Sequence, residues 1–337
     1  MPDPASVPTV SIAIPTYNRI FYLRKAIQCA LAQTYPHIEV IVSDNASSDG
    51  TADYVSSLPD PRLVFFRQQT NLGMAGNWDA CLERATGELF LLLSDDDDLE
   101  ATAVEEMVSG LVNAPAPEKV AAVYCRTWEI DPDDRKQRID PLPPHREAAL
   151  DFAMAYFAGG RALHPCSTLF RTADIRRIGG YAQGTVTLAV DAIIWSRLLL
   201  ERGELIGISK PLASYRIHPG RTTSTWRIEL WRHDIRSLIE IWVDAFRQSP
   251  PKVRRKFQQA ARRYESFEIA AIINQSAQSW PGRIQALGTY FHCRECFAGL
   301  IGLKNLLGGL LKLVVPEAVK DPVRKAILRR QIGGRGI

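Results

Sequence analysis

The amino-acid sequence predicts an α/β protein with a doubly wound, mostly parallel sheet. From residue 9 to about residue 125, short apolar or β-branched runs alternate with segments whose apolar residues recur at helical spacing. Strands and helices that alternate in this way usually form a parallel sheet flanked by helices. The 337 residues, 46% of them hydrophobic, suffice for one large or two modest folded domains.

The first two expected strands are each followed by a polar turn and a helix. Thr9–Ile14 is a β-rich run that stops at Pro15, and helical spacing of apolar residues fills Arg19–Gln33. The second expected strand is Ile38–Ser43. The turn-rich stretch after it supplies an N-cap for a helix over Thr51–Leu58.

The next two strands repeat this alternation. A third strand is expected over Leu63–Arg67, and Asn71-Leu72-Gly73 turns the chain into a helix over about Ala75–Ala85. Gly87 closes that helix. The continuous apolar run Leu89–Leu93 then suits a strand that is buried on both faces.

The remaining elements of the first 220 residues are less regular. The polar, proline-rich residues 131–147 predict a surface loop or a covering hairpin. The other expected elements are helices over Glu100–Val112, Ala173–Ile178 and Asp191–Arg202, and strands over Val120–Cys125, Ser167–Phe170, Leu205–Ile208 and Leu212–Ile217.

From Trp226 onward the pattern is helical and basic, so we expect two parts, residues 1–220 and a mainly helical C-terminal region of residues 221–337. Residues 226–337 contain 20 Lys and Arg against 9 Asp and Glu, which favours an anionic partner surface, either phospholipid or nucleic acid. A helical appendage with a solvated basic face is the alternative.

The apolar segment Phe297–Val315 contains lysines and glycines, so we do not predict a transmembrane helix there. An interfacial amphipathic helix is one interpretation, and a helix packed on the protein's own core is the other. Residues 1–8 lack the features of a secretory signal, and the six cysteines are scattered apart from Cys293 and Cys296. A reduced, cytoplasmic chain is therefore expected.

Ser94 and four consecutive aspartates, Asp95–Asp98, follow the fourth expected strand. Two unit charges about 4 Å apart repel by roughly 1 kcal/mol in water and roughly 4 kcal/mol at an effective dielectric constant of 20, so this cluster needs a positive partner. Mg²⁺ or Mn²⁺, which take oxygen ligands and share them with substrate phosphates, would supply it. An acidic loop or helix N-terminus that faces solvent is the alternative.

Asp44 ends the second expected strand as the aspartates end the fourth. In doubly wound sheets ligands bind beyond the carboxyl ends of the strands, which places both groups at one candidate site. The first strand is not followed by Gly-x-Gly-x-x-Gly, and the chain has no Gly-x-x-x-x-Gly-Lys-Ser/Thr. A dinucleotide site of the Rossmann type and a P-loop are therefore not expected.

In these motifs and their order, residues 8–220 resemble glycosyltransferase family 2, the inverting enzymes of the GT-A fold. Ile14–Asn18 is similar to the first-strand signature of the family, and Val42–Thr51 to the second-strand motif, whose aspartate typically binds the pyrimidine base. The nucleotide-sugar-binding residues that the resemblance implies are Pro15, Thr16, Tyr17, Asn18, Arg19, Asp44, Asn71, Gly73, Asn77, Ser94 and Asp95.

The aspartate cluster is similar to the Asp-x-Asp motif of the family, which holds the metal and the diphosphate, with one departure. Aligned on the hydrophobic residue after the cluster, Ser94 takes the place of the first aspartate. Asp96 would then be the main metal ligand, and Asp95 or Asp97 could hold ribose or a nearby water. The register stays open by one residue. Asp97 and His218 are the further candidate metal ligands, the histidine by its place after a Tyr-Arg strand.

The resemblance also implies a catalytic base. An inverting displacement needs a carboxylate that takes a proton from the acceptor hydroxyl. In the family this base opens a helix after a Gly-Gly-aromatic stretch, as Asp191 does after Gly180. A helix N-cap is the structural alternative for Asp191. His164 and Trp195 are candidates for the acceptor pocket, with core packing favoured for Trp195.

Together these features imply a transferase dependent on Mn²⁺ or Mg²⁺ that moves a sugar from a UDP- or dTDP-sugar to a hydroxyl of a glycan or lipid-linked oligosaccharide. Such relatives build bacterial surface polysaccharide, which would make the protein cytoplasmic or peripheral on the inner membrane. A sugar-phosphate nucleotidyltransferase would need a glycine-rich basic loop after the first strand, and a non-catalytic nucleotide-sugar-binding protein would have lost Asp191. A nucleic-acid partner is not expected, since the basic tail lacks interleaved aromatic residues.

Overall fold

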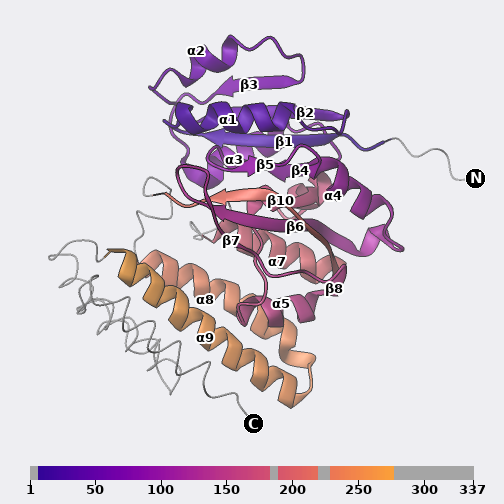
Figure 1. Cartoon of the computed structure of the whole chain (residues 1–337). Helices are drawn as coiled ribbons and strands as arrows, with labels where there is room; N and C mark the ends of the chain where they lie inside the picture. The colour runs from indigo at the N-terminus through magenta and orange to yellow at the C-terminus, as the bar shows by residue number, and fades with distance from the viewer. Residues whose placement is uncertain (1–6, 183–188, 219–227, 277–337) are drawn as a thin grey trace, which may run out of the picture.

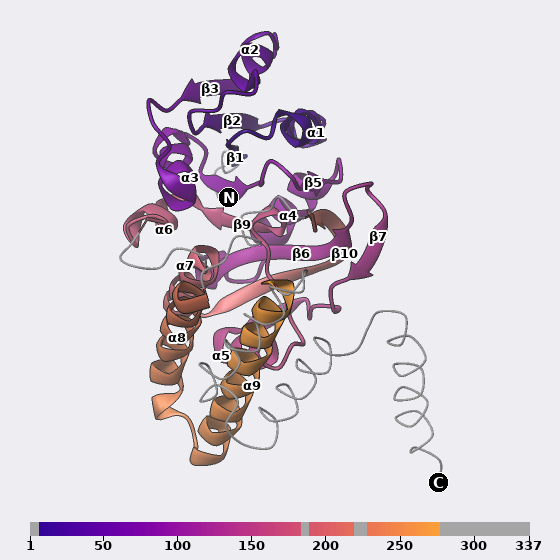
Figure 2. The ribbon, with the colours of Figure 1, turned by 90° about the vertical axis from the view of Figure 1, so that its left-hand side faces the viewer.

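The structure is a computed structural model that describes residues 7–182, 189–218 and 228–276 (Figure 1). In this part of the chain one ten-stranded sheet has the order β3-β2-β1-β4-β9-β6-β10-β5, with β7 beside β6 and β8 beside β10. Helices flank the sheet, and two long C-terminal helices lie below it (Figures 1 and 2). The predicted α/β class, with a mostly parallel sheet and a helical C-terminal extension, is confirmed.

Two groups of parallel strands form the sheet. β1 to β4 pair in parallel, and so do β6 and β10. β9 lies between the two groups and antiparallel to both neighbours, and β5, β7 and β8 are antiparallel at the margins. The strands are β1 (Val10–Thr16), β2 (Ile38–Asp44), β3 (Leu63–Arg67), β4 (Leu89–Leu92), β5 (Asp98–Leu99), β6 (Val120–Ile130), β7 (Lys136–Ile139), β8 (Arg146–Ala148), β9 (Thr168–Arg171) and β10 (Glu204–Arg216).

Two strands differ from the prediction at a proline. β1 continues through Pro15 to Thr16, because β4 pairs only with Val10–Ala13 and the missing N–H of the proline interrupts no pairing on that side. The two strands expected over residues 205–217 are one strand, β10, whose register with β6 shifts around Pro211. An irregular register of this kind lets a strand bend without ending.

The two faces of the sheet bury two separate hydrophobic clusters. Leu89, Leu91 and Leu93 pack with α1 and α4, whereas Phe90 and Leu92 face the cluster that contains α3, α5 and α7. The predicted burial of this strand on both faces is therefore confirmed. The helices are α1 (Ile20–Leu31), α2 (Thr51–Ser56), α3 (Gly73–Arg84), α4 (Ala103–Val112), α5 (Ala149–Phe157), α6 (Thr172–Arg177), α7 (Val190–Arg202), α8 (Ile228–Ala245) and α9 (Pro251–Ser276), with 3-10 turns η1 (Pro117–Lys119), η2 (Pro165–Ser167) and η4 (Phe246–Gln248).

The C-terminal helices α8 and α9 pack on α7 and α5 and share their hydrophobic cluster. The indole N–H of Trp242 donates a hydrogen bond to Ser196 Oγ (2.8 Å), and the hydroxyls of Tyr156 and Tyr264 lie 3.0 Å apart. Within the described ranges, none of the helices is both long enough and apolar enough to cross a bilayer. The apolar segment 297–315 and the pair Cys293 and Cys296 lie outside those ranges.

Candidate active site

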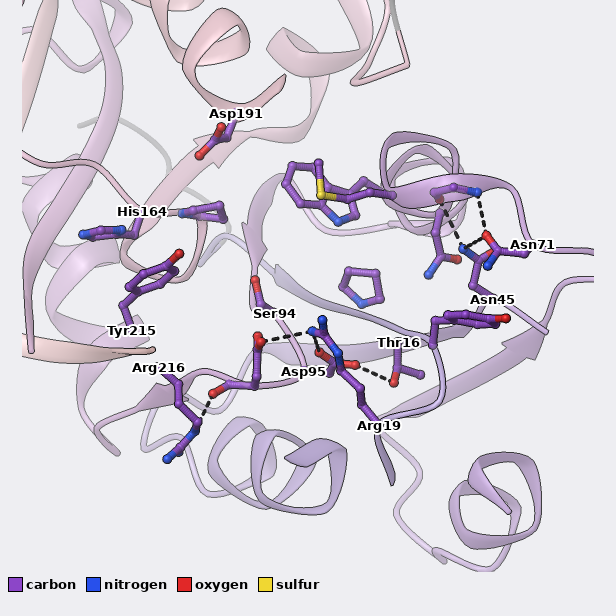
Figure 3. Close-up of a pocket in the computed structure, with 18 residues that line it drawn as sticks. Thr16, Arg19, Asn45, Asn71, Ser94, Asp95, His164, Asp191, Tyr215 and Arg216 are labelled. Atoms are coloured by element: carbon purple, nitrogen blue, oxygen red, sulfur yellow. Dashed lines mark hydrogen bonds and ion pairs between the residues drawn. The ribbon is translucent and has the colours of Figure 1, made fainter. Parts of the chain in front are cut away.

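A cavity of about 360 Å³ opens at the carboxyl ends of the parallel strands, where the sequence predicts the ligand site (Figure 3). The N-terminal ends of α3 and α7 and the turn η2 complete its wall. The predicted site residues that line it are Pro15, Thr16, Tyr17, Arg19, Asn71, Gly73, Asn77, Ser94, Asp95, Asp96 and Asp191. His164, a predicted candidate for the acceptor pocket, also lines it, and the other lining residues are Asn45, Met74, Trp78, Pro165, Tyr215 and Arg216.

Two carboxylates converge on one cation at the edge of this cavity. The Nη1 atom of Arg19 lies 3.1 Å from Asp95 Oδ1 and 3.0 Å from Asp96 Oδ2. The hydroxyl of Thr16 donates to the other oxygen of Asp95 (2.7 Å; Figure 3). Burial, to which the charge of Asp96 adds, raises the pKa of Asp95 to about 7, while Arg19 and Thr16 oppose the rise.

Asp97 and Asp98 point elsewhere. Asp97 is 2% exposed and accepts a hydrogen bond from the backbone N–H of Arg216 (2.9 Å), and burial raises the pKa of its carboxyl group. Asp98 Oδ2 accepts from the guanidinium of Arg216 (2.9 Å) and lies 2.8 Å from Lys25 Nζ. The structure therefore places Asp97, a predicted metal ligand, in contact with β10 rather than in the wall of the cavity.

His218 contacts the cluster without lining the cavity. Its Nε2 atom lies 2.9 Å from Asp96 Oδ2, and its ring packs against Tyr22 with centroids 4.7 Å apart. Arg216, which is 3% exposed, donates from Nε to the backbone carbonyl of Asp96 (2.8 Å). The positive partners that four adjacent aspartates require are therefore Arg19, Arg216 and Lys25, together with His218 when it is protonated.

The predicted base-binding residue Asp44 is buried off the cavity. It is 0% exposed, its Oδ1 atom accepts from the backbone N–H of Ser47 (2.8 Å), and its Oδ2 atom lies 3.4 Å from Arg67 Nε. The next residue, Asn45, lines the cavity instead. Its amide donates to Asn71 Oδ1 (2.9 Å), so the second-strand motif and Asn71 meet as expected, through a different side chain.

Two predicted asparagines brace the loops around the cavity. Asn77, at the start of α3, donates to the backbone carbonyl of Ser43 (3.1 Å) and accepts from its hydroxyl (2.5 Å). Asn18 has a positive φ of 52° and accepts from the backbone N–H of Ser48 (2.7 Å). Asn18 does not line the cavity, and its side chain instead ties the loop after β1 to the loop after β2.

Asp191 is the second residue of α7 and lies on the far side of the cavity from the carboxylate pair (Figure 3). The N-cap position belongs to Ala189, so the alternative of a helix N-cap is wrong. Burial raises the pKa of the Asp191 carboxyl group, and the nearby His164 opposes the rise. Such a group retains a proton more readily than an exposed aspartate does.

His164 and Tyr215 form a stacked pair on the same side of the cavity, with ring centroids 4.6 Å apart. The Nε2 atom of His164 lies 3.4 Å from Asp140 Oδ2. Trp195 is 3% exposed and packs against Phe152 with centroids 5.2 Å apart, in agreement with the core packing expected for it.

The turn after α6 is held by a carboxylate on α3. Asp79 accepts hydrogen bonds from the backbone N–H groups of Tyr181 (2.6 Å) and Ala182 (2.8 Å). Gly180 has a φ of +78°, and a Cβ added to it would lie 2.4 Å from Asp79 Oδ1. Tyr181 in turn packs edge-on against Trp78 of the cavity wall, with centroids 5.3 Å apart.

We expect Gly180→Ala to destabilise the protein by about 3 kcal/mol, from the left-handed backbone and the disrupted contact with Asp79. Gly159→Ala is the matched control, because Gly159 has nearly the same φ (+77°) and no atom within 4 Å of the added Cβ. It should cost about 1 kcal/mol. Urea denaturation of both variants measures the difference, and equal losses would show that the contact with Asp79 is unimportant.

The residues that sequence reasoning missed lie next to residues that it predicted. Asn45 could have been found as the neighbour of Asp44 in the same motif. Met74 and Trp78 extend the helical surface of Asn71, Gly73 and Asn77, but their apolar side chains suit a core equally well. Tyr215 and Arg216 precede the predicted His218, and their separation from the aspartates by more than 110 residues conceals the contact.

The residues present fit a divalent cation that shares its coordination with a ligand. Over the described ranges, no set of three or more His, Cys, Asp or Glu side chains is grouped to hold a metal ion by itself. Asp95 and Asp96, however, direct two carboxylate oxygens to the single position that Arg19 Nη1 occupies. Mg²⁺ and Mn²⁺ sites often use one or two carboxylates and complete their coordination with water and substrate phosphates.

The sequence model described as Glycosyl transferase family 2 matches residues 11–176. The putative teichuronic acid biosynthesis glycosyltransferase TuaG of Bacillus subtilis is 32% identical over 62% of this chain and 79% of its own length. An uncharacterized glycosyltransferase of Rickettsia typhi is 29% identical over 65% of this chain and 67% of that protein. The UDP-Glc:alpha-D-GlcNAc-diphosphoundecaprenol beta-1,3-glucosyltransferase WfaP of Escherichia coli is 31% identical over 29% of this chain and 39% of its own length.

Solved structures share the fold at lower identity. TarS of S. aureus, residues 1–349 in complex with UDP-GlcNAc, has a TM-score of 0.58 and 16% identity over 86% of this chain and 91% of that chain. The mannosyltransferase PcManGT of Pyrobaculum calidifontis, in complex with GDP-Man and Mn²⁺, has a TM-score of 0.53 and 20% identity over 96% of this chain and 90% of that chain. At these identities the likeness concerns the fold alone.

Proposed function

Because this chain belongs to glycosyltransferase family 2, we propose that it is an inverting, metal-dependent enzyme that transfers a sugar from a UDP- or dTDP-sugar to a hydroxyl group. One observation carries the proposal: the carboxylate pair that follows β4 and the half-buried Asp191 of α7 line opposite sides of one cavity. The first suits a diphosphate with its metal, and the second suits a general base.

In the proposed reaction, Asp191 accepts the proton of the acceptor hydroxyl group. The oxygen of that hydroxyl group forms a bond to the anomeric carbon at the same time. The bond from that carbon to the diphosphate breaks on the opposite face, and the diphosphate leaves with the bonding electrons. Asp95 and Asp96 are the ligands that would hold Mg²⁺ or Mn²⁺, with His218 beside Asp96. The ion would stabilise the negative charge that develops on the leaving diphosphate.

The nucleoside would lie in the part of the cavity over the ends of β1 and β2. Pro15, Thr16 and Tyr17 form one wall there, and the hydrogen-bonded pair Asn45 and Asn71 forms another. Asn45 lies where the family motif led us to expect Asp44. Its amide nitrogen already donates to Asn71 and Gly73 and its oxygen accepts from the backbone N–H of Leu72, so the second lone pair of that oxygen is what it would offer to a pyrimidine. Arg19, between the nucleoside side and the carboxylates, would contact the phosphates.

For the acceptor, we propose a glycan or lipid-linked oligosaccharide of bacterial surface polysaccharide synthesis. Support comes from the diphosphoundecaprenol acceptor of WfaP and the teichuronic acid pathway of TuaG. We further propose residues 1–220 as the catalytic part and residues 221–337 as a peripheral membrane contact. The described helix α9 presents exposed basic residues, including Lys252, Arg255, Lys256, Arg262 and Arg263.

We expect this basic helix to give salt-sensitive binding to anionic vesicles, measured by co-sedimentation with phosphatidylglycerol vesicles at low and high ionic strength. Replacing Lys252, Arg255 and Lys256 by glutamine should weaken the binding. If the same fraction of the protein co-sediments with neutral phosphatidylcholine vesicles, the contact is not electrostatic.

The donor is tested by incubating the protein with UDP-, dTDP- and GDP-sugars, with and without Mn²⁺, and measuring slow release of the nucleoside diphosphate. Metal-dependent release from one donor is the expected result. If calorimetry shows that no nucleotide sugar binds in the presence of Mn²⁺, the proposal fails. Release of pyrophosphate from a nucleoside triphosphate and a sugar 1-phosphate would instead identify a nucleotidyltransferase.

The pH dependence of transfer should report the ionisation of the proposed base, Asp191. Because burial raises the pKa of Asp191 and the base acts only when deprotonated, kcat/KM should fall on acidification at a pH above the ordinary aspartate value of 3.8. The measurement uses saturating Mn²⁺ at every pH, since ligand carboxylates bind metal only when ionised. Activity that stays constant down to pH 4 would contradict a carboxylate base with a raised pKa.

A further inference from the structure

A second, smaller cavity opens beside Asp191. Its volume is about 20 Å³, and it shares His164, Pro165 and Asp191 with the main cavity. It therefore adjoins the main cavity, next to the carboxylate that we propose as base, and we call it the side chamber. The other residues of its wall are Leu92, Leu163, Thr168, Phe170, Tyr181, Ile194 and Trp195.

Apart from the residues at its mouth, the side chamber is built mainly of carbon. Ile194 is 2% exposed and Leu163 is 8% exposed. The hydroxyl of Thr168 already donates its hydrogen to the backbone carbonyl of His164 (2.8 Å). A sugar hydroxyl placed here would lose its hydrogen bonds to water and regain few of them, whereas a methyl group has none to lose.

The size of the side chamber limits its occupant to one small group. A water-sized group needs roughly 10–15 Å³ of cavity, so a chamber of about 20 Å³ admits one methyl-sized group and excludes a second sugar ring. Apolar cavities of protein interiors stay dry. A ligand therefore binds more tightly when one of its apolar groups fits into such a cavity.

We propose that the side chamber binds a methyl group of the donor sugar, either from an acetamido substituent or from C6 of a 6-deoxy sugar. This inference rests on the proposed function, which brings the sugar ring next to Asp191. The donor is favoured over the acceptor because the wall includes Leu92 of β4, the strand that leads directly into Asp95 and Asp96. The enzyme would thus select its donor by an apolar contact beside the reacting carbon.

The test compares donors that differ only by the group in question, using calorimetry in the presence of Mn²⁺. The pairs are UDP-glucose with UDP-N-acetylglucosamine, UDP-galactose with UDP-N-acetylgalactosamine, and UDP-galactose with UDP-6-deoxygalactose. In at least one pair the methyl-bearing donor should bind about 10- to 200-fold more tightly, and that pair identifies the source of the methyl group. Donors that bind without such a preference overturn this inference alone, while failure of both these UDP-sugars and the dTDP-sugars to bind overturns the proposed function as well.

A substitution that fills the side chamber should remove the preference. Ile194→Phe is expected to weaken binding of the methyl-bearing donor about tenfold or more and to leave its methyl-free partner unchanged. Ile193→Phe is the matched control, because Ile193 is also buried in α7, at 6% exposure, but lines neither cavity. Leu163→Phe fills the same chamber from the loop before η2. Equal losses for both donors of a pair would refute the assignment, and the wild-type comparison stands if a variant does not fold.

Discussion

Replacing Asp191 with asparagine is expected to lower kcat/KM about 10³-fold, with little change in donor affinity. General base catalysis contributes about 10²- to 10⁴-fold, and asparagine keeps the size of the side chain but cannot take a proton. Steady-state transfer assays and calorimetry with the donor measure the two quantities separately. A loss that appears in donor binding rather than in turnover would contradict the role of a base.

The stability of the same variant provides an independent check. Burial raises the folded-state pKa of Asp191 above 3.8, so the stabilisation linked to protonation is complete below that pH and is lost as pH rises through the folded pKa. At pH 7 the ionised carboxylate is therefore a cost that Asp191→Asn removes, and the variant should be at least as stable as the wild type. Asp151→Asn, in the first turn of α5 and exposed, is the control with unchanged activity.

Replacing Asp96 with asparagine should have the second large effect, a loss of about 10³-fold in kcat/KM together with loss of the metal-dependent part of donor binding. A metal ion on the leaving diphosphate contributes several kcal/mol of transition-state stabilisation, and asparagine cannot replace the charge of its ligand. Calorimetric titration of the donor with and without Mn²⁺ measures the binding component directly.

Asp97→Asn is the matched control and also decides the register of the aspartate cluster. Asp97 directs its carboxylate to the backbone N–H of Arg216, and an asparagine oxygen can accept the same hydrogen bond. This variant should therefore keep its metal-dependent donor binding. If Asp97→Asn abolishes that binding and Asp96→Asn does not, the register is shifted by one residue and the ligand assignment made here is wrong.

Local patterns in the sequence predict most of the elements around the site. The run from Leu89 to Leu93 is apolar at every position, and the structure buries it between two clusters. Local patterns do not predict strand direction, because an apolar run looks the same whether the strand pairs in parallel or antiparallel. The antiparallel placement of β9 between β4 and β6 depends on a long connection through α5, a helix that sequence reasoning did not predict.

The residues of the candidate site also fall into those that a local motif predicts and those that only the folded chain reveals. Residues that belong to one local motif, such as Pro15, Thr16 and Tyr17, were predicted together because the family resemblance rests on that motif, and all three line the cavity. Whether Asp44 or Asn45 lines the cavity depends on the direction in which each side chain points at the end of β2. The motif alone does not give that direction. The contact of Asp97 with Arg216 joins residues 119 positions apart, and only the folded chain brings them together.

The place of Arg19 between Asp95 and Asp96 has a consequence for the order in which ligands associate. Without a metal, the single charge of the guanidinium already offsets part of the charge of the two carboxylates, so an entering ion must compete with a tethered cation for the same oxygens. Once displaced, that guanidinium needs a new anion, and the donor diphosphate supplies one. Metal and donor should therefore strengthen each other's binding reciprocally, as thermodynamic linkage requires, and Mn²⁺ alone should bind only weakly.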